Sequence, residues 1–292
     1  MVVLYGLVSI LIAFMVGILF AGIARKVKAR VHWRYGPPLY QPIIDIVKLF
    51  HQQSISHGFI FDFGIFFSLT GAIVTLFFIP IGYAVPLREA GGLLVVLYLM
   101  LIAPFGIALS SVEAANPNAS IGISRKFILA LGYEIPFLLI LLSVMTYYGT
   151  ISFVEIVEIQ RQTAWGIVSM PFTGIAFLLI LPAMMGLKPF DQIGAPQEIS
   201  SGPEVEYGGI YLAMSKIQHI FLLFIDIALF VSLFLGGGQE PLTFFLKMLP
   251  VFFVILIIST VYPRFRIEQA FRFCVRWPTI LAFLGLLFVV WR

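Results

Sequence analysis

The chain begins with VVLYGLVSILIAFMVGILFAGIA, Val2–Ala24, a run of mostly apolar residues that contains no charge. A helix that crosses ~30 Å of hydrocarbon needs about 20 such residues. Similar runs recur along the 292 residues, of which 61% are hydrophobic and only 11% are charged. The runs are continuous and do not alternate between apolar and polar residues, which excludes the strands of a membrane β-barrel. The first run is too long for a signal-peptide core and is expected to remain as a helix.

The sequence therefore predicts an all-α integral membrane protein, with one transmembrane domain over residues 1–292. Its single cysteine, Cys274, excludes an internal disulfide framework or a cysteine-ligated cluster. Eight spans are expected: Val2–Ala24, Phe63–Val85, Leu93–Ser111, Phe127–Tyr148, Trp165–Leu187, Ile217–Leu235, Phe244–Tyr262 and Trp277–Trp291.

The positive charges predict how the chain is oriented. With eight spans, both termini lie on one side, and the loops after spans one, three, five and seven lie on the other. Loops rich in Lys and Arg stay in the cytoplasm, so we expect a multi-pass protein of the cell (plasma) membrane with both termini outside. The terminal side has four cations, Arg88, Arg161, Lys247 and Arg292. The opposite side has fourteen: Arg25, Lys26, Lys28, Arg30, Arg34, Lys48, Arg125, Lys126, Lys188, Lys216, Arg264, Arg266, Arg272 and Arg276.

Two shorter segments are amphipathic at the helical period and are not expected to span the membrane. In Gln41–Gln53, apolar residues share one side and polar residues share another, which predicts a helix lying in the cytoplasmic interface after the first span. The apolar side is Ile43, Ile46, Val47 and Phe50, and the polar side is Asp45, Lys48 and Gln52. Ile151–Gln162, on the outer side, has a weaker version of the same pattern.

Two carboxylates fall inside predicted spans. Glu134 lies about 12 Å and Asp226 about 15 Å in from the nearest lysines, Lys126 and Lys216, at 1.5 Å per helical residue. An ionised carboxylate there costs roughly 2.5–3.5 kcal/mol unless it is protonated, paired or hydrated. Such a group suits proton uptake and release. The alternatives are a permanently protonated Glu134 and an Asp226 that pairs with a partner subunit, while His219 fits a satisfied interfacial histidine.

A second acidic group follows the fifth span. Asp191, Glu198, Glu204 and Glu206 place four carboxylates within sixteen residues, opposite loops rich in Arg. A charged network of this kind can pass protons or lock the loops together, and a solvated loop packed on a partner is the alternative. The chain lacks motifs for a metal centre, a phosphate-binding loop or a nucleophilic triad. We therefore expect no catalytic centre in this chain.

The most charged and Pro-rich segment of the chain is RVHWRYGPPLYQPIIDIVKL, Arg30–Leu49. Its RxGPxxxQPxxDxxKL pattern resembles a signature of subunit 1 of respiratory complex I. GYEIP at 132–136, PFD at 189–191 followed by QE at 197–198 and EY at 206–207, and LFLGG at 233–237 resemble further motifs of that family in the same order.

The resemblance implies a membrane protein whose cytoplasmic face docks a hydrophilic redox arm. It implies docking residues Arg30, Arg34, Gly36, Pro37, Gln41, Asp45, Lys48 and Arg125, and a proton path through Glu134, Asp191, Glu198, Glu204, Glu206 and Asp226. The implied partners are an iron–sulfur subunit, a hydrogenase-like large subunit, antiporter-like membrane subunits and lipids, with no nucleic acid. The chain itself is expected to hold no cofactor, and the partner subunits are expected to carry iron–sulfur clusters, with or without a NiFe centre.

The departures from the family pattern point to one branch of it. Gly194 and Pro196 stand where quinone-linked members carry two further glutamates. SIGISR at 120–125 and the short loops look more like the equivalent subunit of energy-converting, membrane-bound NiFe hydrogenases and ferredoxin-linked sulfur-reducing complexes. We therefore predict a membrane subunit that couples electron transfer to proton or sodium translocation. The alternatives are the quinone-binding membrane subunit of an NADH:quinone oxidoreductase and, more remotely, a free-standing secondary transporter.

Overall fold

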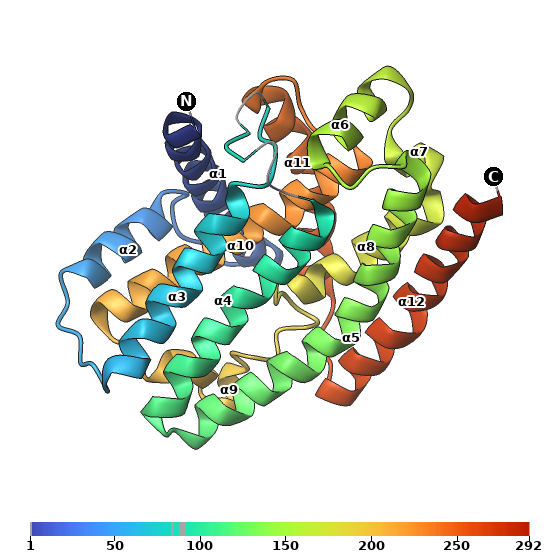
Figure 1. The fold of residues 1–292 in the computed structure, drawn as a ribbon. Coiled ribbons are helices and arrows are strands. Elements are labelled where there is room, and N and C mark those ends of the chain that lie inside the picture. The colour runs from blue at the N-terminus through green and yellow to red at the C-terminus, as the bar shows by residue number, and fades with distance from the viewer. Residues whose placement is uncertain (1, 83–84, 88–91, 292) are drawn as a thin grey trace.

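The structure, a computed structural model, describes residues 2–82, 85–87 and 92–291 and is almost entirely helical (Figure 1). The predicted all-α architecture is confirmed. Within the described residues, one further apolar helix, α8 (Pro171–Met184), is shorter, with 14 residues. Seven helices there are long and apolar enough to cross a membrane: α1 (Val2–Val31), α3 (Phe59–Leu76), α4 (Leu93–Ala114), α5 (Pro117–Tyr148), α10 (Gly209–Phe234), α11 (Pro241–Val261) and α12 (Ile267–Trp291).

The expected fifth span, Trp165–Leu187, is interrupted rather than continuous. A short helix, α7 (Gly166–Ser169), is followed by Met170 at φ −132° and ψ 66°, and α8 then starts at Pro171. A proline disfavours helical geometry in the residue before it, so Pro171 ends α7 and restarts the helix. The expected eight spans are therefore seven long helices and one short one in the part of the chain that the structure describes.

Other helix bounds differ from the expected spans in a way that matters for the site. Helix α5 begins at Pro117 rather than Phe127, and α10 begins at Gly209 rather than Ile217. Hydropathy marks the apolar part of a helix, whereas a helix can continue beyond it through polar residues. Lys126 and Lys216, which were expected in loops, therefore lie inside helices. The second span ends as a helix at Leu76, before the expected Val85.

The amphipathic segments both form helices, α2 (Gln41–Phe50) and α6 (Phe153–Gln162). Helix α2 buries Pro42, Ile46 and Leu49. Three residues that we expected on the same side as Ile46, namely Ile43, Val47 and Phe50, are exposed instead. Helix α2 thus has one apolar row against the bundle and a second one free to contact lipid.

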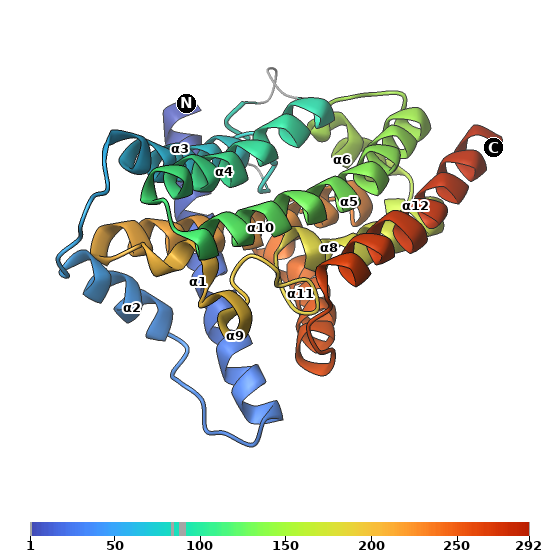
Figure 2. The same ribbon diagram turned by 90° about the horizontal axis from the view of Figure 1, so that it is seen from below.

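Helix α10 forms the centre of the bundle. Its apolar segment is 83% buried, compared with 22% to 50% for the other long helices. Figures 1 and 2 show α10 surrounded by other helices, with α12 at one edge beside α5. Phenylalanines fill the space around it, and the rings of Phe177 and Phe230 lie 5.6 Å apart. Glycines allow close packing elsewhere: a Cβ on Gly106 of α4 would lie 2.5 Å from the carbonyl oxygen of Gly64 on α3.

The four expected loops gather at one end of the bundle. This end, which we call the loop face, comprises residues 32–58, 115–116, 185–208 and 262–266, and it includes the short helices α2, α9 (Pro196–Ile199) and η1 (Gly202–Val205). The start of α1 and the end of α12 lie away from α9 (Figure 1). The chain thus alternates direction as predicted. Arg88 and Arg292, two of the cations assigned to the terminal side, lie outside the described residues.

Candidate proton path and docking surface

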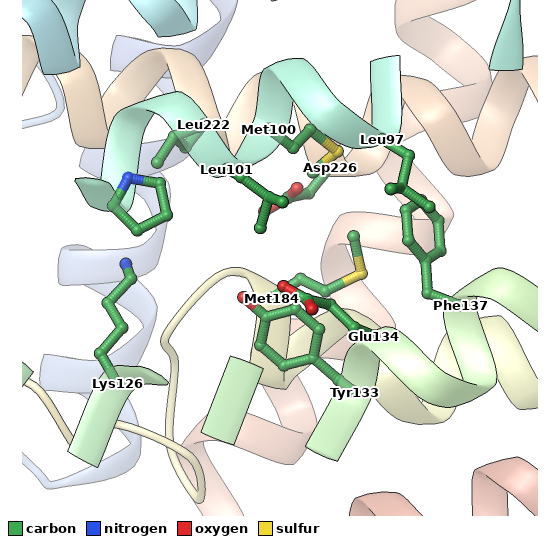
Figure 3. Close-up of a pocket in the computed structure, with 11 residues that line it drawn as sticks. Leu97, Met100, Leu101, Lys126, Tyr133, Glu134, Phe137, Met184, Leu222 and Asp226 are labelled. Atoms are coloured by element: carbon green, nitrogen blue, oxygen red, sulfur yellow. The ribbon is translucent and has the colours of Figure 1, made fainter. Parts of the chain in front are cut away.

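Glu134 on α5 and Asp226 on α10 line the same small cavity (Figure 3). This inner cavity has a volume of about 40 Å³, above the ~10–15 Å³ that one water molecule needs. Helices α4, α5, α8 and α10 enclose it. Its other lining residues are Leu97, Met100, Leu101, Pro104, Lys126, Tyr133, Phe137, Met184 and Leu222.

Asp226 is the most deeply buried carboxylate that the structure describes. Its residue is 1% exposed, and its Oδ1 atom has no hydrogen-bond partner. Most buried polar atoms are hydrogen-bonded, and an unpartnered one calls for an explanation. Glu134 is only half-buried and points with Tyr133 from α5 into the same space (Figure 3). The fold therefore brings together the two intramembrane acids, which are 92 positions apart in the sequence (226 − 134).

Lys126 is a third charged residue of this site, although its charge had placed it in a loop. Its side chain reaches from α5 toward α4 (Figure 3), and its ammonium attracts the carboxylate of Asp226 across the cavity. Lys126 forms no ion pair within the described residues. Its position seven residues before Tyr133 puts the two on one side of α5, a signal that was available in the sequence.

A second cavity connects the first one to the loop face. This loop cavity has a volume of about 70 Å³ and shares Lys126 and Leu222 with the inner cavity. Glu204 of η1 is the acid that lines it. Its other lining residues are Ile107, Ile193, Gly194, Ser201, Pro203, Tyr207, Ser215, Gln218 and His219. Lys126 and Leu222 thus separate two polar spaces that lead from the loop face toward Glu134.

Two side chains of α10 add to this polar lining. The Nε2 atom of buried Gln218 has no hydrogen-bond partner. His219, which we expected to be a satisfied interfacial histidine, forms no hydrogen bond with the described residues. Both side chains therefore retain unused hydrogen-bonding capacity beside Lys126.

The other three acids of the loop face are held by partners from different segments. Asp191 accepts a hydrogen bond from Arg264 at 2.9 Å, and Glu198 accepts one from Arg125 at 2.6 Å. The Glu206 carboxylate lies 3.2 Å from His57 Nε2 and also accepts from the Asn116 side chain. These pairs tie the 185–208 loop to its neighbours and leave Glu204 as the acid that faces the cavity.

Glu204 is expected to stay protonated at a higher pH than a free glutamate. Burial raises the pKa of its carboxyl, nearby Asp191 adds to the rise, and Lys216 opposes it. Burial disfavours the ionised form, so this group's contribution to stability falls as the pH rises through its folded-state pKa. In infrared spectra recorded against pH, a protonated carboxyl band should persist above about pH 4.3, the ordinary glutamate value.

Glu204→Gln should remove that band and the associated fall in stability. The matched control is Glu268→Gln, at a side chain that is 80% exposed, and it should leave the band in place. A band that survives in Glu204→Gln would assign the high-pH proton to another group.

The segment between α1 and α2 presents an exposed surface, which we call the docking surface: Arg30, Trp33, Arg34 and Tyr35. Trp33 is 98% exposed and Tyr35 is 83% exposed. The guanidinium of Arg30 lies 4.9 Å from the centre of the Tyr35 ring. Arginine and large aromatics dominate binding energy at protein interfaces. The sequence motif singled out Arg30 and Arg34 but not the two aromatic residues.

The turn that carries this surface depends on Gly36. Its φ is +77°, and a Cβ there would lie 2.9 Å from the Cβ of Ala29. A side chain at this position would therefore be strained and would push the turn away from α1. Pro37 follows directly and fixes the backbone that leads toward α2.

Asp45 and Gln41 serve inside the chain rather than on this surface. Arg25, at the end of α1, donates to Asp45 at 2.6 Å, and Gln41 donates to the same carboxylate at 2.9 Å. The Arg25 bond lowers the pKa of the Asp45 carboxyl against the opposing effect of burial, and the Gln41 bond adds to it. This contact fastens α2 to α1. Lys48, by contrast, is exposed, and Arg125 is bound to Glu198 as described above.

Three or more His, Cys, Asp or Glu residues do not cluster as a metal site within the described residues. The comparisons with known proteins are consistent with a membrane subunit. The sequence profile of the NADH dehydrogenase family matches residues 4–290. The chain belongs to the NADH dehydrogenase subunit 1 family. The resemblance found in its motifs is therefore confirmed.

Relatives of this subunit 1 homologue fall into several kinds of complex. It is 31% identical to hydrogenase-4 component C of Escherichia coli over 81% of this chain and 76% of that protein. It is 30% identical to the equivalent NADH-quinone oxidoreductase subunit of Protochlamydia amoebophila, over 85% and 84%. A chain in the solved structure of the membrane-bound sulfane sulfur reductase, an archaeal respiratory membrane complex, is 41% identical. That match covers 99% of both chains with a TM-score of 0.94.

Proposed function

We propose that this subunit 1 homologue joins a hydrophilic redox arm to ion-translocating membrane subunits and carries protons between them. The observation that carries the proposal is the pair of cavities that leads from the loop face to Glu134 and Asp226. The similarity to the sulfane sulfur reductase chain supports a ferredoxin-linked sulfur-reducing complex. Membrane-bound hydrogenase, to which hydrogenase-4 component C points, is the related assignment.

In this proposal, the redox arm binds at the docking surface and alters charge at the loop face. Glu204 exchanges a proton with the loop cavity, and Lys126 sits between that cavity and the inner one. Because Lys126 is attracted to Asp226, a change in protonation on either side shifts the balance on the other. Glu134 then passes charge to the neighbouring membrane subunits, and Asp191, Glu198 and Glu206 keep the loops in register.

The surface of α5 supports a membrane neighbour next to Glu134. Leu131, Ile135, Leu138 and Leu142 are all between 45% and 62% exposed. Their spacing places them along one side of the helix. We assign this stripe to antiporter-like subunits. The iron–sulfur and hydrogenase-like subunits, with their iron–sulfur clusters and any NiFe centre, are assigned to the loop face. That face is proposed to be cytoplasmic in the cell membrane, with both termini outside.

A specific observation keeps the quinone-reducing alternative in view. An apolar cavity of about 420 Å³ lies between α1, the α1–α2 segment, α2 and α11, lined by Met15, Val16, Ile18, Leu19, Leu39, Tyr40, Ile43 and Phe245. A quinone tail or a lipid chain fits such a lining. Gly194 and Pro196, however, place no carboxylate beside the loop cavity, and Pro196 lacks a backbone donor. We therefore assign the apolar cavity to a lipid chain.

Purification of the intact complex from native membranes tests this function. We expect iron–sulfur subunits to co-purify, ferredoxin-dependent sulfur reduction or hydrogen production, and no change in rate with quinone-site inhibitors. Stoichiometric quinone in the active complex, or strong inhibition by such a compound, would favour the quinone-reducing alternative. Solute transport by the chain alone in liposomes would instead favour a free-standing transporter.

A further inference from the structure

The end of the bundle opposite the loop face contains a larger polar cavity, which takes no part in the proposed path. We call it the outer cavity. It has a volume of about 550 Å³ and lies between the end of α6, α7, the turn after α10 and the start of α11. Its lining residues are Gln160, Arg161, Thr163, Ala164, Trp165, Val168, Gly236, Gly238, Gln239, Thr243 and Lys247.

Two cations are held at fixed positions on its wall. The ammonium of Lys247 donates to the carbonyl oxygens of Leu235 and Gly237, each at 2.6 Å. The guanidinium of Arg161 donates to the carbonyl oxygen of Gly238. Gly236 and Gly237 have φ of +69° and +55°, the left-handed conformation that glycine adopts without strain. This turn presents its carbonyls to the two cations.

The walls of the outer cavity are also pinned to each other. Gln160 is 2% exposed. Its Nε2 donates to the carbonyl oxygens of Ser232 at 3.0 Å and Leu233 at 3.1 Å, and its Oε1 accepts from Gly166 N at 3.0 Å. The Lys247 ammonium lies 5.2 Å from the centre of the Trp165 ring. The cavity is therefore built before any ligand arrives.

The charge of this cavity is uncompensated by its lining. Arg161 and Lys247 lie close enough to repel each other, and neither forms an ion pair with the described residues. No Asp or Glu lines the cavity among the residues that the structure describes. Lysine has three donors and arginine has five, so the three carbonyl contacts leave donors free on both. Threonine and glutamine side chains add further hydrogen-bonding groups.

The mouth of the outer cavity has the character of a membrane interface. Trp165 is 51% exposed, and the nearby apolar residues Val168, Leu242 and Leu246 are 70%, 64% and 55% exposed. Tryptophan is enriched where acyl chains meet headgroups. A phosphate can thus reach the two cations while attached acyl chains lie along the exposed apolar residues.

We propose that the outer cavity binds a phosphate group, with Arg161 and Lys247 as its cationic ligands. An arginine contributes several fixed donors to a phosphate and a lysine contributes a point charge. The phosphate group comes from an anionic lipid or from free phosphate. Capping of the α10 carbonyls alone would require neither the open cavity nor two cations that repel each other.

Native mass spectrometry of the purified intact complex tests this assignment. The complex is exchanged into micelles that contain phosphatidylglycerol or phosphatidylcholine, and the bound lipid is counted. Each cation near a membrane surface contributes about 1 kcal/mol to binding an anionic lipid, about fivefold in affinity. Arg161→Gln should therefore weaken phosphatidylglycerol retention about fivefold, and the double variant with Lys247→Gln about 25-fold. Arg161→Gln keeps an amide donor for Gly238, which protects the fold.

Two further arms separate the sources and control for charge. If inorganic phosphate displaces the lipid, the cavity recognises the phosphate alone; if it does not, the lipid chains contribute as well, and either result supports the site. Arg272→Gln removes a cation that is 82% exposed and paired with Glu268, and it should leave retention unchanged. Equal retention of both lipids with no effect of phosphate, or equal retention by wild type and both cavity variants, would overturn the assignment.

Discussion

Glu134→Gln should abolish ion translocation by the assembled complex while ferredoxin-driven electron transfer continues in part. Glutamine keeps the size of the side chain and its contacts in the inner cavity, but it cannot release a proton. Removal of a side chain that transfers protons typically costs about 10²- to 10⁴-fold in the affected step. We therefore expect the number of ions moved per electron to fall by about 10²-fold. Electron transfer itself takes place in the redox arm and is affected only through coupling.

The measurement uses proteoliposomes that contain the intact complex, with reduced ferredoxin as the donor and with proton and sodium fluxes recorded together. Glu134→Asp keeps a carboxyl in the cavity and should retain part of the translocation. Glu268→Gln, at a side chain that is 80% exposed on α12, should retain all of it. If Glu134→Gln translocates normally, Glu134 is a structural acid and the proposed path is wrong.

The sequence was most informative where one residue property sufficed. Continuous apolar runs predicted the helices of the bundle, and charges inside those runs predicted Glu134 and Asp226 as residues of interest. The interrupted fifth span was missed because its residues are uniformly apolar, although Pro171 was a visible break. Helix α5 was placed too short because the Ser120–Arg125 stretch is polar, while the helix extends through it.

The partners of the charged residues could not be predicted in the same way. Arg25 and Asp45 are 20 positions apart, and Asp191 and Arg264 are 73 apart, so these pairs depend on how distant segments pack. Lys126 was assigned to a loop by its charge, whereas the fold turns its side chain toward Asp226. The position of a charge in the sequence indicated which residues matter, and only the packing showed which of them face each other.

The docking surface gives the second large expected effect. Arg34→Ala should release the hydrophilic redox arm from the membrane part or uncouple the two. Arg34 is exposed beside Trp33 and Tyr35, and exposed aromatics next to arginine form typical interface anchors. Truncation of such an anchor costs about 2 kcal/mol or more, which corresponds to about thirtyfold weaker binding.

Pull-down of the redox subunits with tagged complex, followed by dissociation rates at increasing salt, measures this loss. Trp33→Ala should weaken the arm as well, because an indole that is 98% exposed has no packing role within this chain. Arg272→Ala, which removes an exposed arginine from α12, is the matched control and should keep the arm bound. Asp45→Ala separates docking from folding, since it breaks the Arg25 contact and frees α2 without removing a surface cation. If Arg34 faces lipid or bulk water in the assembled complex, or if Arg34→Ala leaves the arm bound and coupled, then the arm docks on another part of the loop face.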